Sequence, residues 1–139
     1  QSIVDNIGAD LEGSFGSMPG AISKGSAKFG ELAAAKGMDG SAPYVGESYD
    51  AAALIALAIQ AGGSADRQSI LSNISRVANA PGMKIMPGQL AYGLQMLAEG
   101  KDIDYQGATD VEFNAFGDAA GAFKELEVSG GTFVTVGAL

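Results

Sequence analysis

One apolar segment limits what this chain can fold into more than any other feature of its sequence. Residues 42–64 read APYVGESYDAAALIALAIQAGGS, in which Tyr49 and every residue from 51 to 59 are apolar. This pattern predicts a helix over residues 45–61 that ends at the glycine pair 62–63. Such a helix has no polar face and needs cover on all sides, yet the run is well short of the roughly 18 to 20 residues that cross a bilayer. The sequence therefore predicts a buried helix that other parts of the protein must surround.

The composition predicts a packed globular core and argues against several functions. The chain has 139 residues, of which 47% are hydrophobic, and a mean hydropathy of +0.16, which favours folding over disorder. A net charge of −8 without any cluster of Lys or Arg argues against a nucleic-acid partner. The absence of His and Cys removes triad and thiol chemistry and the commonest metal ligand. We expect no catalytic residue, no metal site and no cofactor, and so not an enzyme.

Two short motifs approach known functional sites but fail at a required position. Residues 46–50 are similar to a nucleophile elbow, but Asp50 stands where the second Gly is needed and no strand precedes them. Residues 102–113 begin like a calcium-binding loop, but Phe113 stands where a bidentate Glu is needed. We interpret the second motif as a polar turn between a helix and a strand.

The remaining patterns predict helices first and strands towards the end of the chain. Ile3, Val4 and Ile7 have the spacing of a helix face that stops at Gly8. We therefore expect that the chain begins inside an element and is a fragment. Further helices are predicted over residues 21–36, 64–80 and 88–100, and Ser64 is expected to cap the second of them. Strands are predicted over residues 11–18, where the strand is expected to be buried, and over 103–113. A hairpin is predicted from residues 123–128 and 132–136. The first of these strands has no obvious partner nearby in the sequence, which indicates that part of the fold is missing.

An ordered series of motifs resembles one protein family. The series is Leu11-Glu12-Gly13, Pro19-Gly20, Pro43-Tyr44 ahead of SYDAA (48–52), GKDIDYQGA (100–108), and VEF (111–113) with Gly117-Asp118. It is similar to the C-terminal part of the periplasmic solute-binding proteins of ABC importers, in the branched-chain amino acid (Leu/Ile/Val) group. The resemblance implies an α/β chain that is a C-terminal fragment of a two-lobed type I periplasmic-binding-protein fold, because full-length members are well over twice as long.

The same resemblance implies how the chain is divided between the two lobes. Residues 1–18 would end the second lobe, 19–118 would form a helical segment of the first lobe, and 119–139 would return as a hairpin in the second lobe. The function implied is extracytoplasmic binding of an amino acid or related solute, in the periplasm, for delivery to the membrane permease of an ABC importer. The alternative is a self-associating or regulatory ligand-sensing domain built on the same half-fold, and a homodimer is expected for the isolated fragment because half a core leaves apolar surface exposed.

One ligand-binding residue is carried over from the family. Tyr44 matches a position where the family places an aromatic ring against the ligand side chain, although packing at the helix start would explain the residue equally well. Glu47 and Tyr49 are near enough to approach the cleft, but an acidic residue at a helix N-terminus is favoured by the helix dipole alone, and we do not include them in the site. Asn114 and Phe116 depart from the residues usual in the family, and an exposed Phe116 would provide an extra contact surface.

Overall fold

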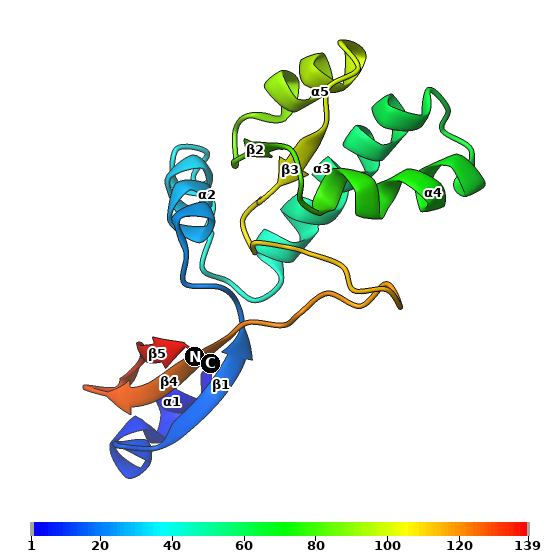
Figure 1. Cartoon of the computed structure of the whole chain (residues 1–139). Coiled ribbons are helices and arrows are strands. Elements are labelled where there is room, and N and C mark those ends of the chain that lie inside the picture. The colour runs from blue at the N-terminus through cyan, green and yellow to red at the C-terminus, as the bar shows by residue number, and fades with distance from the viewer. Residues whose placement is uncertain (1, 139) are drawn as a thin grey trace. The chain divides into compact units, whose positions relative to one another are not determined.

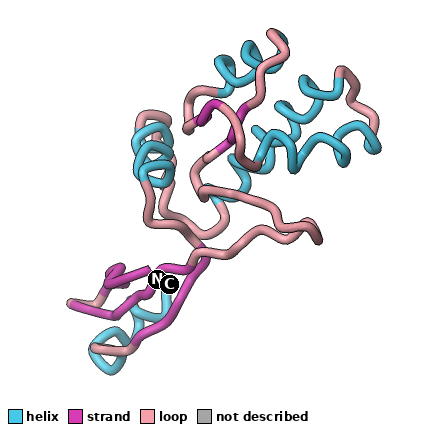
Figure 2. The backbone as a smooth tube through the Cα atoms, in the orientation of Figure 1, coloured by secondary structure: helices cyan, strands magenta, loops and turns pink. Residues whose placement is uncertain are grey.

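The computed structural model describes residues 2–138 and divides the chain into two compact units (Figures 1 and 2). The sheet unit contains residues Gln1–Ile22 and Gly121–Leu139, and the helical unit contains Ser23–Ala120. The assignment of residues 1–18, 19–118 and 119–139 to two lobes stays a prediction, because the division into units does not identify the lobes to which they belong.

The sheet unit is built on three antiparallel strands in the order β1-β4-β5. Its elements are α1 (Ser2–Ile7), the 3-10 helix η1 (Gly8–Leu11), β1 (Phe15–Pro19), β4 (Phe123–Ser129) and β5 (Thr132–Ala138). Gly130 and Gly131 join β4 to β5 with φ values of +60° and +73°, a left-handed turn that glycine adopts without strain. The predicted hairpin is confirmed. The strand that lacked a neighbour in the sequence pairs with β4, where Phe15 lies opposite Glu127.

The predicted buried strand over residues 11–18 is wrong in its start and in its burial. Leu11 closes η1, and Gly13 at φ +77° turns the chain before the strand begins at Phe15. Phe15 is 92% exposed, because its side chain points to a face of this three-stranded sheet that the described residues leave uncovered. The predicted N-terminal helix is present as α1, but Ile3 and Ile7 on its expected apolar face are exposed, and the side chain of Val4 lies outside what the structure describes.

The helical unit places four helices around a pair of short parallel strands (Figure 1). Its elements are α2 (Lys24–Ala34), α3 (Val45–Gly62), α4 (Arg67–Ala78), β2 (Met83–Ile85), α5 (Leu90–Ala98) and β3 (Ile103–Tyr105). The main core forms where α3, α4 and α5 meet the two strands, and its most buried members are Leu57, Ala58, Val77, Ala78, Ile85, Ile103 and Tyr105. A smaller cluster joins Phe29 and Ala33 of α2 to Ala108.

Local hydrogen bonding moves several boundaries from their predicted positions. Ser23 and Ser26 form a reciprocal capping box, so α2 begins at Lys24 rather than at residue 21. Ser64 was predicted to cap the next helix, but Asp66 occupies the N-cap position and the Ser64 hydroxyl donates to its carboxylate at 2.7 Å. The strand predicted over residues 103–113 ends at Tyr105, because the backbone then turns through Gly107 at φ +57°.

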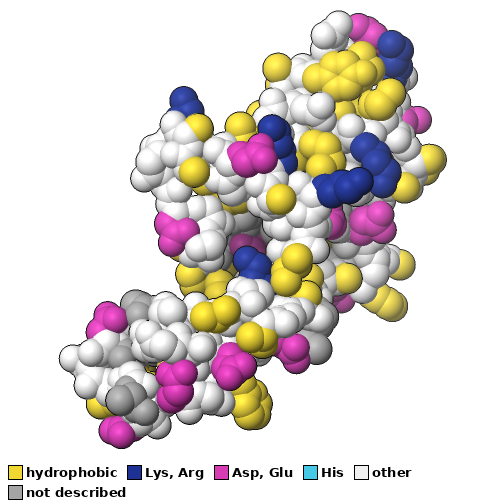
Figure 3. Space-filling view, turned by 90° about the vertical axis from the view of Figure 1, so that its left-hand side faces the viewer, with side chains coloured by type: hydrophobic (Ala, Val, Ile, Leu, Met, Phe, Trp, Pro, Cys, Tyr) yellow, Lys and Arg dark blue, Asp and Glu magenta, His cyan; other side chains and the backbone are white. Residues whose placement is uncertain are grey.

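The apolar helix α3 has cover on one side only. Asp50, Ala53, Leu54, Leu57 and Ala58 are buried against the rest of the helical unit, whereas Ile55 is 45% exposed on the outer side. The prediction of an apolar helix over residues 45–61 is confirmed, and the described residues supply only part of the cover that it requires. No described helix is both long and apolar enough to cross a membrane. Figure 3 shows that hydrophobic side chains also reach the surface of both units among the charged ones.

Candidate functional site

Tyr44 lies immediately before α3 with its side chain 63% exposed. Its backbone has φ +64°, a left-handed conformation that is uncommon for a residue with a side chain. The Tyr44 carbonyl accepts hydrogen bonds from the backbone N–H of Ser48 at 3.0 Å and from its hydroxyl at 2.7 Å, which holds the start of the helix. Within residues 2–138, the Tyr44 hydroxyl has no hydrogen-bond partner. The ring is therefore free to contact a molecule from outside, and its role in ligand binding stays a prediction.

Tyr49 is occupied by contacts within the helical unit. Its ring packs against Phe29 of α2 with the ring centroids 4.9 Å apart, and its hydroxyl accepts the backbone N–H of Gly88 at 2.8 Å. These contacts tie α3 to α2 and to the loop that precedes α5. Tyr49 therefore has a structural explanation that needs no ligand.

Asp50 is buried, with 2% of its surface exposed, and its carboxylate accepts several hydrogen bonds. Its Oδ1 accepts the Tyr105 hydroxyl at 2.9 Å and the Ala108 N–H at 2.8 Å. Its Oδ2 accepts the N–H of Thr109 at 2.8 Å and the hydroxyl of the same residue at 2.7 Å. A buried carboxylate is tolerated only when its oxygens are satisfied in this way. Asp50 thus fastens the loop that follows β3 onto α3.

The loop can approach Asp50 this closely because residue 107 is glycine. A Cβ built on Gly107 would lie only 2.6 Å from both Asp50 Cγ and Tyr105 Cε1, and the residue has φ +57°. Burial, followed by the charge and the hydrogen bond of Asp50, raises the pKa of the Tyr105 hydroxyl far above its usual value. Tyr105 is therefore a fixed neutral donor and not a group that exchanges protons in a reaction.

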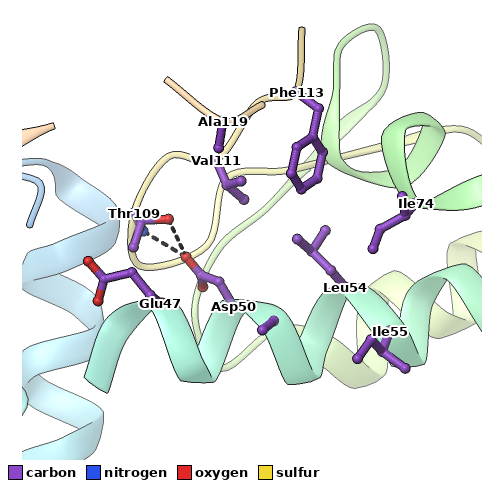
Figure 4. A pocket seen from close by; sticks show the side chains of 10 residues that line it. Glu47, Asp50, Leu54, Ile55, Ile74, Thr109, Val111, Phe113 and Ala119 are labelled. Atoms are coloured by element: carbon purple, nitrogen blue, oxygen red, sulfur yellow. Dashed lines mark hydrogen bonds between the residues drawn. The ribbon is translucent and has the colours of Figure 1, made fainter. Parts of the chain in front are cut away.

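An apolar groove of about 290 Å³ runs along the outer side of α3 beyond Asp50 (Figure 4). It lies between α3, Ile74 of α4 and the segment 109–119, and its lining residues are Glu47, Asp50, Ala51, Leu54, Ile55, Ile74, Thr109, Val111, Phe113 and Ala119. In Figure 4, Leu54 points from α3 towards Val111 and Phe113 on the opposite wall. The Asn79 side chain donates to the Phe113 carbonyl at 2.7 Å and accepts its N–H at 2.9 Å, which fixes that wall.

The residues of the two failed motifs have structural partners. Asp102 pairs with Arg76 of α4 at 2.8 Å, and Asp104 is buried and accepts from the Gln106 side chain at 3.0 Å. No group of three or more acidic side chains among the described residues is placed to hold a metal ion. Asp50 lies inside α3 and bonds to the loop after β3.

Phe116 is exposed and lies in a hydrogen-bonded turn. The fraction of its surface that is exposed is 90%. Asn114 closes the turn, because its side-chain oxygen accepts the N–H of Phe116 at 2.8 Å and that of Asp118 at 3.0 Å.

The sequence patterns did not identify Asp50 as a site residue. The available signal was a single acidic residue immediately before an apolar run, which predicts a partner wherever the helix is buried. The sequence gives no means of identifying Tyr105, Ala108 and Thr109 as those partners, because they follow more than fifty residues later.

Comparison with known proteins shows the fold but no close sequence relative. No known family profile matches the chain, and no curated protein matches it at a significant level. Among solved structures, a leucine-binding protein, LivK, from Thermotoga maritima superimposes on 99% of the chain with a TM-score of 0.65 and 19% sequence identity. The match covers 34% of the leucine-binding protein, so this chain spans about a third of its length. The chain accordingly has the α/β fold of part of a branched-chain amino acid binding protein, as the sequence motifs predicted.

Proposed function

We propose that this chain is the C-terminal part of an extracytoplasmic solute-binding protein that serves an ABC-type amino acid importer. The observation that carries the proposal is the superposition of 99% of the chain on a leucine-binding protein. That neighbour is a binding protein and not an enzyme, which supports a non-catalytic function here. The solute is a branched-chain or related amino acid, and the loaded protein delivers it in the periplasm to the membrane permease.

Tyr44 is the residue of this chain that we assign to the solute. Its ring is exposed and its hydroxyl is unpaired within the described residues, whereas nearby Tyr49 is held by Phe29 and Gly88. An aromatic ring offers an apolar face to an aliphatic side chain, and its hydroxyl offers a hydrogen bond to a polar one. The other contacts to the solute come from parts of the longer protein outside these residues.

Calorimetric titration of the full-length protein with free amino acids tests the proposal. We expect leucine, isoleucine or valine, or a related solute in the same panel, to bind with one-site stoichiometry. Complete burial of an aromatic side chain contributes roughly 1.5 to 3 kcal/mol, so Tyr44→Ala should weaken binding by at least about tenfold. Tyr92→Ala is the matched control, because Tyr92 on α5 is also exposed, at 41%, and is not assigned to the site.

The outcomes separate the function from the assigned contact. Binding of no amino acid in the panel would refute the proposed function. Equal affinities of Tyr44→Ala and Tyr92→Ala would leave solute binding in place but remove Tyr44 from the site.

A further inference from the structure

The turn that leads into α3 holds Tyr44 at a position that favours glycine or asparagine. The Ala42 carbonyl accepts the backbone N–H of Val45 at 3.3 Å, and Pro43 and Tyr44 lie between them. Tyr44 has φ +64° and ψ 4°, close to the angles of the third residue of a type II turn, in which proline is common at the second position. A residue with a Cβ keeps such angles only where the surrounding structure holds it there.

The contacts that hold Tyr44 are made by its backbone. The ring is 63% exposed and its hydroxyl has no hydrogen-bond partner within residues 2–138, so the side chain does not fix the conformation. The Tyr44 carbonyl, in contrast, accepts both the N–H of Ser48 at 3.0 Å and the Ser48 hydroxyl at 2.7 Å. Both bonds require this carbonyl to point along α3, and a change in the backbone angles of Tyr44 would break them.

The backbone conformation of Tyr44 determines where its ring points. Rotation about the N–Cα bond carries Cβ with it, so a change of φ from +64° to a negative value would move the ring to another side of the turn. A ring that is already fixed in the free protein does not have to be ordered when a ligand binds, which favours affinity.

The same kind of hydrogen bond occurs in α4 without this consequence. The Ser72 hydroxyl donates to the Gln68 carbonyl at 2.9 Å, four residues earlier, as Ser48 does to Tyr44. Gln68 lies inside the helix and is not among the residues with positive φ. The bond from Ser48 therefore differs in what it holds, which is an exposed aromatic residue in a left-handed conformation.

We propose that Ser48 is a positioning residue for the solute site, because its hydroxyl holds Tyr44 in the left-handed conformation and so sets the direction of the ring before the solute arrives. The proposal rests on the proposed function in taking Tyr44 as a contact to the solute. Ser48 acts only through Tyr44. Without the hydroxyl, Tyr44 leaves this conformation for part of the time, and the apparent affinity falls with the fraction of molecules that remain competent to bind.

Calorimetric titration of the full-length protein with leucine, isoleucine or valine, whichever binds the parent most tightly, measures the effect on affinity. Ser48→Ala should weaken binding about fivefold, as expected for the loss of one hydrogen bond. Ser48→Thr should restore the parent affinity, because a threonine hydroxyl can donate to the same carbonyl. Ser72→Ala is the matched control and should leave affinity unchanged. In a Tyr44→Ala background, Ser48→Ala should have no further effect.

Nuclear magnetic resonance of the solute-free protein measures the conformation itself. In full-length protein labelled with ¹⁵N at tyrosine, a strong nuclear Overhauser effect between the amide proton and Hα of one residue marks a positive φ, because these protons are closest there. The Tyr44 signal is identified by its absence in Tyr44→Phe. We expect this effect to weaken about twofold in Ser48→Ala, in proportion to the lost population, and to keep its parent strength in Ser48→Thr and Ser72→Ala.

The two measurements separate the positioning role from the proposed function. An unchanged nuclear Overhauser effect in Ser48→Ala overturns the positioning role, and so does an unchanged affinity of that variant for a bound amino acid. A further loss of affinity when Ser48→Ala is added to Tyr44→Ala also overturns it, because Ser48 would then act independently of the ring. A protein that binds no amino acid rejects the proposed function, and the nuclear Overhauser effect still decides whether Ser48 holds Tyr44.

Discussion

Replacement of Asp50 by Asn is the most direct test of how the loop after β3 is held on α3. The substitution keeps the size of the side chain but replaces one carboxylate oxygen with an NH₂ group, which donates and cannot accept. In the native protein each oxygen accepts one backbone N–H, from Ala108 or from Thr109. Whichever way the amide turns, its NH₂ group therefore faces one buried N–H that can no longer be satisfied.

The expected cost follows from these contacts. Hydrogen bonds to a charged group contribute roughly 1.5 to 3 kcal/mol each, and a buried donor left without an acceptor costs about 1 to 3 kcal/mol. The Tyr105 and Thr109 hydroxyls can rotate to accept from the amide, so only one bond is lost outright. We expect Asp50→Asn to lower the free energy of unfolding by about 3 kcal/mol. Tyr105→Phe removes a single donor and should cost about 1 to 2 kcal/mol.

Urea denaturation followed by circular dichroism measures both effects. The double variant of Asp50→Asn with Tyr105→Phe should lose less than the sum of the single variants, because the two groups share one hydrogen bond at 2.9 Å. A loss below about 1 kcal/mol for Asp50→Asn, with an unchanged dependence on urea, would show that water or another group satisfies the loop. That result would refute the assignment of Asp50 as the residue that holds the loop after β3 on α3.

Two further predictions concern the same loop. Gly107→Ala should cost several kcal/mol, because its Cβ would lie within 2.6 Å of Asp50 Cγ. Gly37→Ala, at φ +71° with open space around its Cβ, should cost only the backbone strain of about 1 kcal/mol, and equal urea midpoints would show that the loop shifts freely. Burial raises the pKa of Tyr105, so its contribution to stability is complete below about pH 10 and is lost as the pH rises further. Between about pH 8 and pH 11, Tyr105→Phe should therefore lose about 1 kcal/mol less stability than the parent protein. Identical pH profiles of the parent protein and Tyr105→Phe would contradict the raised pKa of Tyr105.

Local sequence patterns predicted the helices of the helical unit because each has its own terminal signal. The helix over residues 45–61 is confirmed as α3, and Gly63 at φ +64° ends it. The hairpin was also predicted correctly, because the pair Gly130-Gly131 separates two segments that alternate between apolar and polar residues. In both cases neighbouring residues determine the geometry.

The failures have a common origin in distant contacts. The pattern did not predict β2 at all, because its pairing with β3 joins Met83 to Ile103 across an intervening helix. The predicted strand over 103–113 was too long, because Asp50 draws the chain into a turn at Gly107 that the apolar alternation does not reveal. The Asp50 site was missed for the same reason.

At the start of α3, Tyr49 and Asp50 are bonded to neighbouring elements, whereas the Tyr44 side chain is exposed. Variants at these positions can therefore separate effects on solute binding from effects on stability. Asp50 holds the loop after β3 on one side, and Tyr49 holds Phe29 and Gly88 on the other. Between residues 44 and 50, the Tyr44 ring alone combines an aromatic surface with large exposure. Removing this ring takes away few internal contacts, so it should change affinity for the solute and leave the free energy of unfolding within about 0.5 kcal/mol. Removing the Asp50 carboxylate should instead lower the free energy of unfolding. It should weaken solute binding only to the extent that the start of α3 moves. If the proposed assignment of Tyr44 is correct, Tyr44→Ala changes affinity without changing stability and Asp50→Asn changes mainly stability, whereas a Tyr44→Ala variant with unchanged affinity would remove Tyr44 from the site.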